Sequence, residues 1–140
     1  MSATLGNKRK CYVGVTTSGS TTYSMLTGET SNSLTLNNNV IEISDKDTEY
    51  QSFIGGIKGG TGSVTVHADD TNENQKKLLA ALASGDQVPI FIGELNTTPT
   101  NGLAFMALIN SISETNDNGS VASRDFSFTI TGAWTHYPTV

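Results

Sequence analysis

The stretch "RDFSFTITGAW" (residues 124–134) decides the fold class. Phe126, Phe128 and Ile130 alternate with serine and threonine along it. Strict alternation of apolar and polar residues is typical of a strand that turns one face to a core and the other to water. We therefore expect an antiparallel sheet.

Working outward from this strand, other segments show a strand-like composition. The segment "LAFMALINSIS" (residues 103–113) is apolar on both faces, which indicates a central strand, and "VPIFIGEL" (residues 88–95) precedes it. Shorter strands are expected in "CYVGV" (residues 11–15), in "TTYSML" (residues 21–26) and in the alternating "GSVTVHAD" (residues 62–69). Turn-forming residues separate these segments, so the sequence predicts six to eight strands.

One helix is expected, in "DTNENQKKLLAALASG" (residues 70–85). Asp70 or Asn72 can cap its start, and Gly85 suits its end. Its apolar stripe is formed by Leu78, Leu79 and Leu82. The expected fold is mainly β: a β-sandwich or barrel of antiparallel strands with one packed α-helix, in a single domain over residues 1–140.

Composition argues against several classes of protein. The 140 residues carry a formal net charge of −5 and 15% charged residues, which does not favour a nucleic-acid reader. The basic cluster Lys8, Arg9 and Lys10 falls in an expected N-terminal arm, residues 1–10. The single cysteine, Cys11, cannot form an internal disulfide. With no signal-peptide pattern and no apolar run of membrane-spanning length, we expect a protein made and folded in a cytosol.

The glycine-rich stretch "SFIGGIKGGTGSVTV" (residues 52–66) invites a phosphate-binding interpretation. Gly55 and Gly60 have the spacing of a P-loop, but Thr61 stands where the lysine must be. A strand pattern follows where the motif requires a helix. We expect instead a glycine-rich turn that closes a long loop, residues 45–60.

No catalytic or metal-binding pattern stands out. Ser63, His67 and Asp69 share a strand face but span roughly 13 Å, too far for a catalytic triad. The possible soft metal ligands are isolated, without paired spacing: Cys11, His67 and His136. The alternating acids at 45, 47 and 49 lack the glycine and the terminal glutamate of an EF-hand. The sequence predicts neither enzyme activity nor a cofactor or metal.

The predicted loop 45–60 combines charges with apolar residues, and loops of this length in compact domains are usually functional or disordered. Its charged residues come first and its large apolar residues later, which favours a loop that packs against another surface. The candidate contact residues are Asp45, Lys46, Asp47, Glu49, Tyr50, Phe53, Ile54 and Ile57.

The order of features resembles the major tail tube proteins of long-tailed (siphovirus-type) phages. The resemblance rests on "SLTLNNNVIEISDKDTEYQSFIGGIKGGTGSVTVHAD", then on "DTNENQKKLLAALASGDQVPIFIG", and then on "LAFMALINSISETNDNGSVASRDFSFTITGAW". It covers residues 34–134 and is a likeness of element order and local texture.

This resemblance implies a β-sandwich that assembles as hexameric rings, which stack into a hollow tube in the virion tail after assembly in the host cytoplasm. DNA would pass through the lumen without specific binding. The implied partners are further copies of the chain, a tape measure protein, a tail terminator and a distal tail protein. Loop 45–60 would dock on the next subunit or ring, and Lys8, Arg9 and Lys10 would supply a second contact between rings.

Two alternatives stay open on the sequence alone. A tube protein of a contractile or type VI-like injection system would share the ring architecture. A carbohydrate-binding or adhesive β-sandwich would instead use Trp134, Tyr137 and Tyr12 as a stacking surface.

Overall fold

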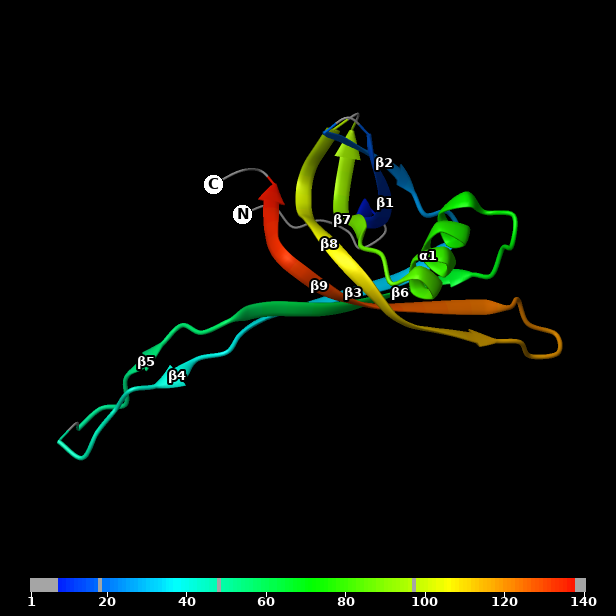
Figure 1. Ribbon diagram of the computed structural model, residues 1–140. Helices are drawn as coiled ribbons and strands as arrows, with labels where there is room; N and C mark the ends of the chain where they lie inside the picture. Colours follow the sequence, from blue (N-terminus) through cyan, green and yellow to red (C-terminus); the bar gives the residue numbers. More distant parts are fainter. Residues whose placement is uncertain (1–7, 18, 48, 97, 138–140) are drawn as a thin grey trace.

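The computed structural model describes residues 8–17, 19–47, 49–96 and 98–137. Within these ranges the chain forms nine strands and one helix (Figure 1). In chain order they are β1 (Lys10–Thr17), β2 (Ser20–Met25), β3 (Glu29–Asn38), β4 (Ile41–Glu42), β5 (Phe53–Ile54), β6 (Lys58–His67), α1 (Glu73–Ser84), β7 (Val88–Asn96), β8 (Thr98–Thr115) and β9 (Ser123–Tyr137).

Seven of the strands form one antiparallel sheet in the order β2-β1-β7-β8-β9-β6-β3, and β4 pairs with β5 in a separate hairpin. The long strands β8 and β9 curve, so the two halves of the sheet face each other across the core (Figure 1). The predicted class, mainly antiparallel β with one helix, is confirmed. The two layers are halves of one continuous sheet.

The bend in β9 coincides with a break in the pairing of β8 with β9. Ala104 pairs with Thr135, but Met106 pairs with Thr131, so β9 carries extra residues at this point. Gly132 lies among them with φ of 81°, a conformation that costs other residues free energy because of the Cβ atom. The bulge thus gives β9 the curvature that closes the core.

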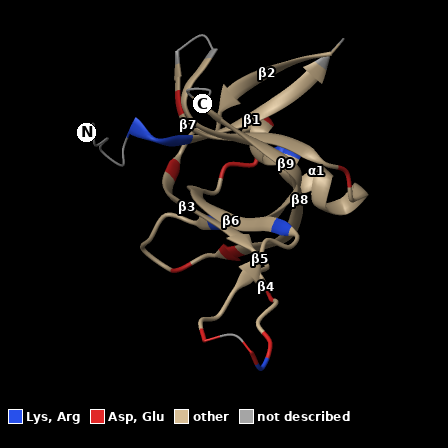
Figure 2. Ribbon diagram, turned by 90° about the vertical axis from the view of Figure 1, so that its left-hand side faces the viewer, with Lys and Arg blue, Asp and Glu red and all other residues tan. Residues whose placement is uncertain are grey.

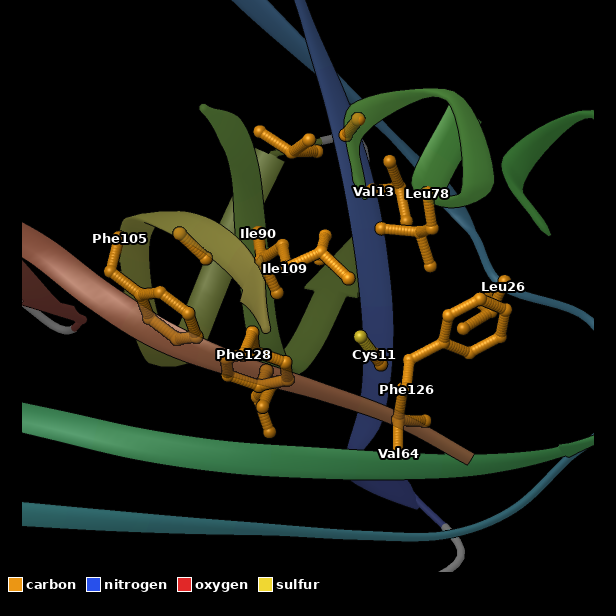
Figure 3. Close-up of a cluster of buried hydrophobic side chains, with 14 of the residues drawn as sticks. Cys11, Val13, Leu26, Val64, Leu78, Ile90, Phe105, Ile109, Phe126 and Phe128 are labelled. Atoms are coloured by element: carbon orange, nitrogen blue, oxygen red, sulfur yellow. The ribbon is translucent and has the colours of Figure 1, made fainter. Parts of the chain in front are cut away.

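Aromatic side chains fill the space between the two halves of the sheet (Figure 3). Phe126 and Phe128 of β9 are fully buried, and the ring of Phe128 stacks on Phe105 of β8 with centroids 5.5 Å apart. Leu78 of α1 closes one end of this core beside Val13 (Figure 3). The alternation that predicted strand β9 therefore marks the centre of the core.

From Lys58 on, the glycine-rich stretch is part of a strand, so the prediction of a glycine-rich turn was wrong for that part. β6 already begins at Lys58, and its glycines 59, 60 and 62 pair with β3, whereas Gly55 and Gly56 precede the strand. A Cβ atom on Gly60 would lie 2.8 Å from Ile130 Cδ1, and one on Gly62 would lie 2.7 Å from the Phe128 ring. These glycines leave room for large side chains of β9, and they do not open a loop.

Helix α1 has the predicted ends but a different buried face. The Asn72 side chain accepts hydrogen bonds from the backbone N–H groups of residues 74 and 75, and Gly85 ends the helix with φ of 78°. Leu78 is buried as predicted, whereas Leu79 and Leu82 are more than one third exposed. Their expected burial was wrong because the helix turns Asn74 and Gln75 to the sheet instead.

A polar cluster fixes α1 to the sheet. The Arg124 Nη1 atom donates to Gln75 Oε1 at 2.9 Å, and its Nη2 atom donates to Asp70 Oδ1 at 3.0 Å. Glu114 on β8 accepts from the same guanidinium group. The Gln75 amide also donates to the backbone oxygen of His67 at 3.0 Å. The two buried members, Gln75 and Arg124, are both paired, which is the condition for a polar cluster to stabilise a fold.

Replacing the amide that links this cluster is expected to destabilise the fold. In Gln75→Leu the Arg124 guanidinium and the His67 carbonyl both lose a buried partner, at a cost of about 3 kcal/mol in the free energy of unfolding. The same change at the exposed Gln87 serves as the matched control. Chemical denaturation of both variants gives the comparison, and equal stabilities contradict this role for Gln75.

Acid is expected to weaken the same cluster through Glu114. Hydrogen bonds from Asn116 and then Arg124 hold the pKa of this carboxyl below its ordinary value. A depressed folded-state pKa stabilises the fold above the unfolded pKa of roughly 4.3, and this contribution is lost as the pH falls through the folded-state pKa. In Glu114→Gln, thermal unfolding over a pH series should show a smaller loss of Tm in acid than in the wild type. An equal fall of Tm in acid for both proteins would show that protonation of Glu114 does not contribute to the loss of stability.

Candidate assembly surfaces

The hairpin of residues 39–57 projects away from the body of the molecule, beyond the end of β3 and β6 (Figure 1). Two short strands hold it, with Ile41 opposite Ile54 and Glu42 opposite Phe53. The Ser44 side chain accepts from the Ser52 backbone N–H at 2.6 Å. At its base Asn38 Oδ1 accepts from the Gly56 backbone N–H at 3.2 Å. The predicted loop 45–60 is therefore the outer part of a hairpin plus the start of β6.

This hairpin exposes an unusual amount of apolar surface. Tyr50 is 78% exposed and Ile57 is 85% exposed. Five further apolar side chains of the hairpin are about half exposed: Val40, Ile41, Ile43, Phe53 and Ile54. An isolated two-stranded hairpin is at best marginally stable in water, and contiguous exposed apolar residues mark interaction sites. The predicted contact residues of this loop thus lie together on one projecting element.

The outer end of the hairpin is acidic. Asp45, Asp47 and Glu49 lie there with Lys46, and all four are exposed (Figure 2). The Asp47 backbone N–H donates to Asp45 Oδ1 at 3.0 Å, which is a local turn typical of aspartate. The hairpin therefore has a charged tip, formed by Asp45, Lys46, Asp47 and Glu49. Its shaft is apolar and carries the seven exposed apolar side chains described above.

The predicted N-terminal contact residues lie where the sheet begins. Lys10 is the first residue of β1 and pairs with Gly93, so the part of the predicted arm that the structure describes is short. Residues 1–7 of that arm lie outside the described residues. The Arg9 backbone oxygen accepts from Asn32 Nδ2 at 3.1 Å. Lys8 and Lys10 are exposed and Arg9 is half-buried.

A groove of about 820 Å³ runs beside these basic residues. Arg9 and Lys10 form one side of it, and the chain from Met25 to Asn32 forms the other. The Glu29 carboxylate accepts from the Cys11 backbone N–H at 2.9 and 3.1 Å and from Asn32 Nδ2 at 2.9 Å. Sequence reasoning missed this groove, because its two sides are brought together only by the sheet.

The outer strands of the main sheet are the third surface. β3, with ten residues, and β2, with six, are the end strands of the seven-stranded sheet. An end strand carries backbone N–H and C=O groups along its outer edge that a neighbouring chain can pair with. On the described sheet, β2 and the part of β3 beyond Asn32 are where a strand of another copy can pair, since Glu29 and Asn32 contact residues 9–11.

Aromatic residues expected of a sugar-binding platform are used in packing. Tyr12 and Tyr137 both contact the buried ring of Phe91, with ring centroids 5.8 and 6.1 Å apart. Trp134 is half-buried and packs against the core. Three aromatic rings engaged in this way do not form a flat exposed surface, which disfavours the carbohydrate-binding alternative.

Residues that a catalytic triad or a metal site would use make structural contacts instead. Ser63 Oγ lies 3.1 Å from Ser33 Oγ, and Asp69 accepts from Thr71. Burial raises the pKa of the Cys11 thiol, which disfavours the reactive thiolate. Among the described residues, no group of three or more His, Cys, Asp or Glu side chains is placed to hold a metal ion. None of the described helical residues form a segment able to span a lipid bilayer.

The fold is that of tail tube proteins. The chain matches the tail of an empty gene transfer agent particle, determined with C6 symmetry, with a TM-score of 0.78 and 14% sequence identity over 96% of this chain and 98% of the other. It matches the tail tube of SPP1 with a TM-score of 0.75 and 12% identity over 97% of this chain and 80% of the other. The fold implied by the sequence resemblance is confirmed.

A third structure bears on the injection-system alternative. The chain matches a protein of the anti-feeding prophage baseplate with a TM-score of 0.63 and 11% identity over 99% of each chain. This likeness is lower than those to the gene transfer agent tail and the SPP1 tube. No protein-family model matches the chain, and no curated protein matches its sequence.

Removing the projecting hairpin is expected to leave the body of the fold intact. Because the hairpin is bonded to itself and to the ends of β3 and β6, replacing residues 40–56 by Asn-Gly preserves the Asn39–Ile57 contact with a two-residue turn. The expected change in Tm is less than about 5 °C. A large drop in thermal unfolding temperature would show that the hairpin stabilises the body.

Proposed function

We propose that the chain is the subunit of a hollow tail tube of the long-tailed phage type. Six copies form a ring, and rings stack into a tube through which DNA leaves the virion. The supporting observation is the pairing of two features: a fold shared with a C6-symmetric tail, and a projecting hairpin that leaves seven large apolar side chains exposed. An enzyme needs neither feature, whereas a subunit of a stacked tube needs a surface of this kind.

Edge pairing provides the contact within a ring. The outer edges of β2 and β3 lie at opposite ends of one sheet, so pairing between neighbours continues the sheet from copy to copy. The contact joins two different surfaces, and such heterologous contacts close into a ring when the rotation permits. The same pairing covers edges that are a liability on a monomer.

The sheet face opposite the core suits the wall of a DNA channel. On β3, β6, β8 and β9 this face presents short hydroxyl side chains, with Ser33 contacting Ser63 and Thr65 donating to Asp125. In the described parts of these strands the cationic residues are Lys58 and Arg124. Both occupy positions that belong to the opposite face of the sheet from the hydroxyl side chains. A wall without cations holds DNA weakly, because little counterion release drives binding. The hydroxyl positions are Ser33, Thr35, Thr61, Ser63, Thr65, Ser111, Ser127 and Thr129.

The hairpin provides the contact between rings in this proposal. Phe53 and Ile54 lie in β5 and project with it from the body (Figure 1). Docking on the next subunit buries their apolar surface, at roughly 25 cal/mol per Å². The apolar shaft is therefore the adhesive part of the hairpin.

The role of the shaft is tested with Phe53→Ala and Ile54→Asp. The loss of apolar contact and the introduction of a carboxylate should reduce the mass of sedimentable tubes at least tenfold, while the folded subunit persists by circular dichroism. The conservative variants Phe53→Leu and Ile54→Val are the matched controls and should retain tubes. Full-length tubes from Phe53→Ala and Ile54→Asp would refute the docking role.

The same assembly assay separates the tube from the adhesive alternative. An adhesive module is monomeric at every concentration and binds glycans through exposed aromatics. A tube subunit assembles cooperatively above a threshold concentration and gains nothing from added sugar. The implied tape measure, terminator and distal tail proteins are then sought by co-assembly.

A further inference from the structure

Charges of opposite sign gather at two separate places on the chain. Three of its eight Lys and Arg residues are Lys8, Arg9 and Lys10, at the start of β1. Four of its thirteen Asp and Glu residues lie on the hairpin, three of them at the tip. Figure 2 shows the basic stretch and the acidic tip at different ends of the molecule.

The groove beside the basic residues is suited to an acidic peptide turn. Lys10 and Arg9 border it, and the half-exposed Met25 supplies an apolar wall. The Glu29 carboxylate inside it is occupied by the Cys11 N–H and the Asn32 amide. Among the lining residues, Arg9 and Lys10 carry two positive charges against the single negative charge of Glu29, so the groove is net positive. Hydroxyl groups of Thr27 and Thr30 also line it.

We infer that the acidic tip of one copy docks in this basic groove of a copy in the adjacent ring. The inference rests on the tube proposed above and names the receiving surface for the hairpin. Asp47 and Glu49 face Lys10, which lines the groove, and Lys8, which lies beside it in the chain, while Tyr50 covers the apolar wall at Met25. The charges determine the register of the contact, and the apolar shaft adds affinity.

In the proposed tube, this arrangement lets stacking continue from ring to ring. Tip and groove are different surfaces of the same chain, so each copy donates one tip and receives one. A head-to-tail contact of this kind does not close on itself when successive copies are related by translation, and it propagates as a filament. Copies of a ring joined in this way form a tube.

A charge-reversal pair tests the contact. The groove variant is Lys8→Glu with Lys10→Glu, and the tip variant is Asp47→Lys with Glu49→Lys; all four side chains are exposed, so both variants should fold. Each variant alone meets like charge at every contact, and its threshold concentration for tubes should rise at least tenfold at low salt. Matched controls on exposed sites elsewhere are Lys76→Glu with Lys77→Glu, and Asp86→Lys with Asp117→Lys.

Mixing the two reversed variants is the decisive step. In an equimolar mixture, each wild-type tip meets a wild-type groove and each reversed tip meets a reversed groove, so alternating tubes should form near the wild-type threshold. Failure of the mixture to recover, or wild-type thresholds for each variant alone, overturns the inference while leaving the tube intact. Absence of tubes from the wild type under every condition instead refutes the proposed function.

Adding a short DNA duplex to the assay tests whether the groove binds nucleic acid, the other acidic ligand that its lysines could attract. The basic groove is assigned to a second copy of the chain, so the groove variant should lose assembly whether or not DNA is present. Binding of a short duplex that is abolished in the groove variant, with assembly unchanged, would assign these lysines to nucleic acid and contradict the inference.

Discussion

One sheet has to supply both walls of the core. The aromatic side chains of Phe105, Phe126 and Phe128 stay dry only because β8 and β9 are long enough to bend and bring the two halves of the sheet together. The bend depends on the bulge at Gly132, and the close approach of β6 to β9 depends on Gly60 and Gly62. A sheet closed in this way keeps two free end strands, and β3 and β6 continue beyond the core as the projecting hairpin. The surfaces available for assembly thus follow from how the core is closed.

Local patterns predicted much of this fold. Alternation in β9 is set by the half-buried strand itself, and the Asn72 cap and Gly85 end of α1 are local chemistry that a sequence records directly. The glycines of β6 were misread, because the large side chains they accommodate come from a strand more than 60 residues away. Burial of Arg124 and Gln75, and exposure of Leu79 and Leu82, equally depend on which face of α1 meets the sheet. These features depend on contacts between residues that are distant in the sequence, and the periodicity of a local segment does not predict them.

The candidate surfaces divide along the same line. Mixed charge and apolar character in residues 45–57 indicated a docking segment, and the structure gathers these residues on one hairpin. The groove from Met25 to Asn32 was invisible in the sequence, since neither side has a distinctive motif. Because the groove lies beside Lys8, Arg9 and Lys10, these basic residues border a concave surface that can receive a segment of another copy.

The central claim is that this chain assembles into hollow sixfold tubes, and electron microscopy of the purified wild-type protein over a rising concentration series tests it most directly. The account predicts hollow tubes whose end-on averages show six subunits, with folded subunits below the assembly threshold. Compact monomers at every concentration, with no rings or tubes at low or high salt, would contradict it.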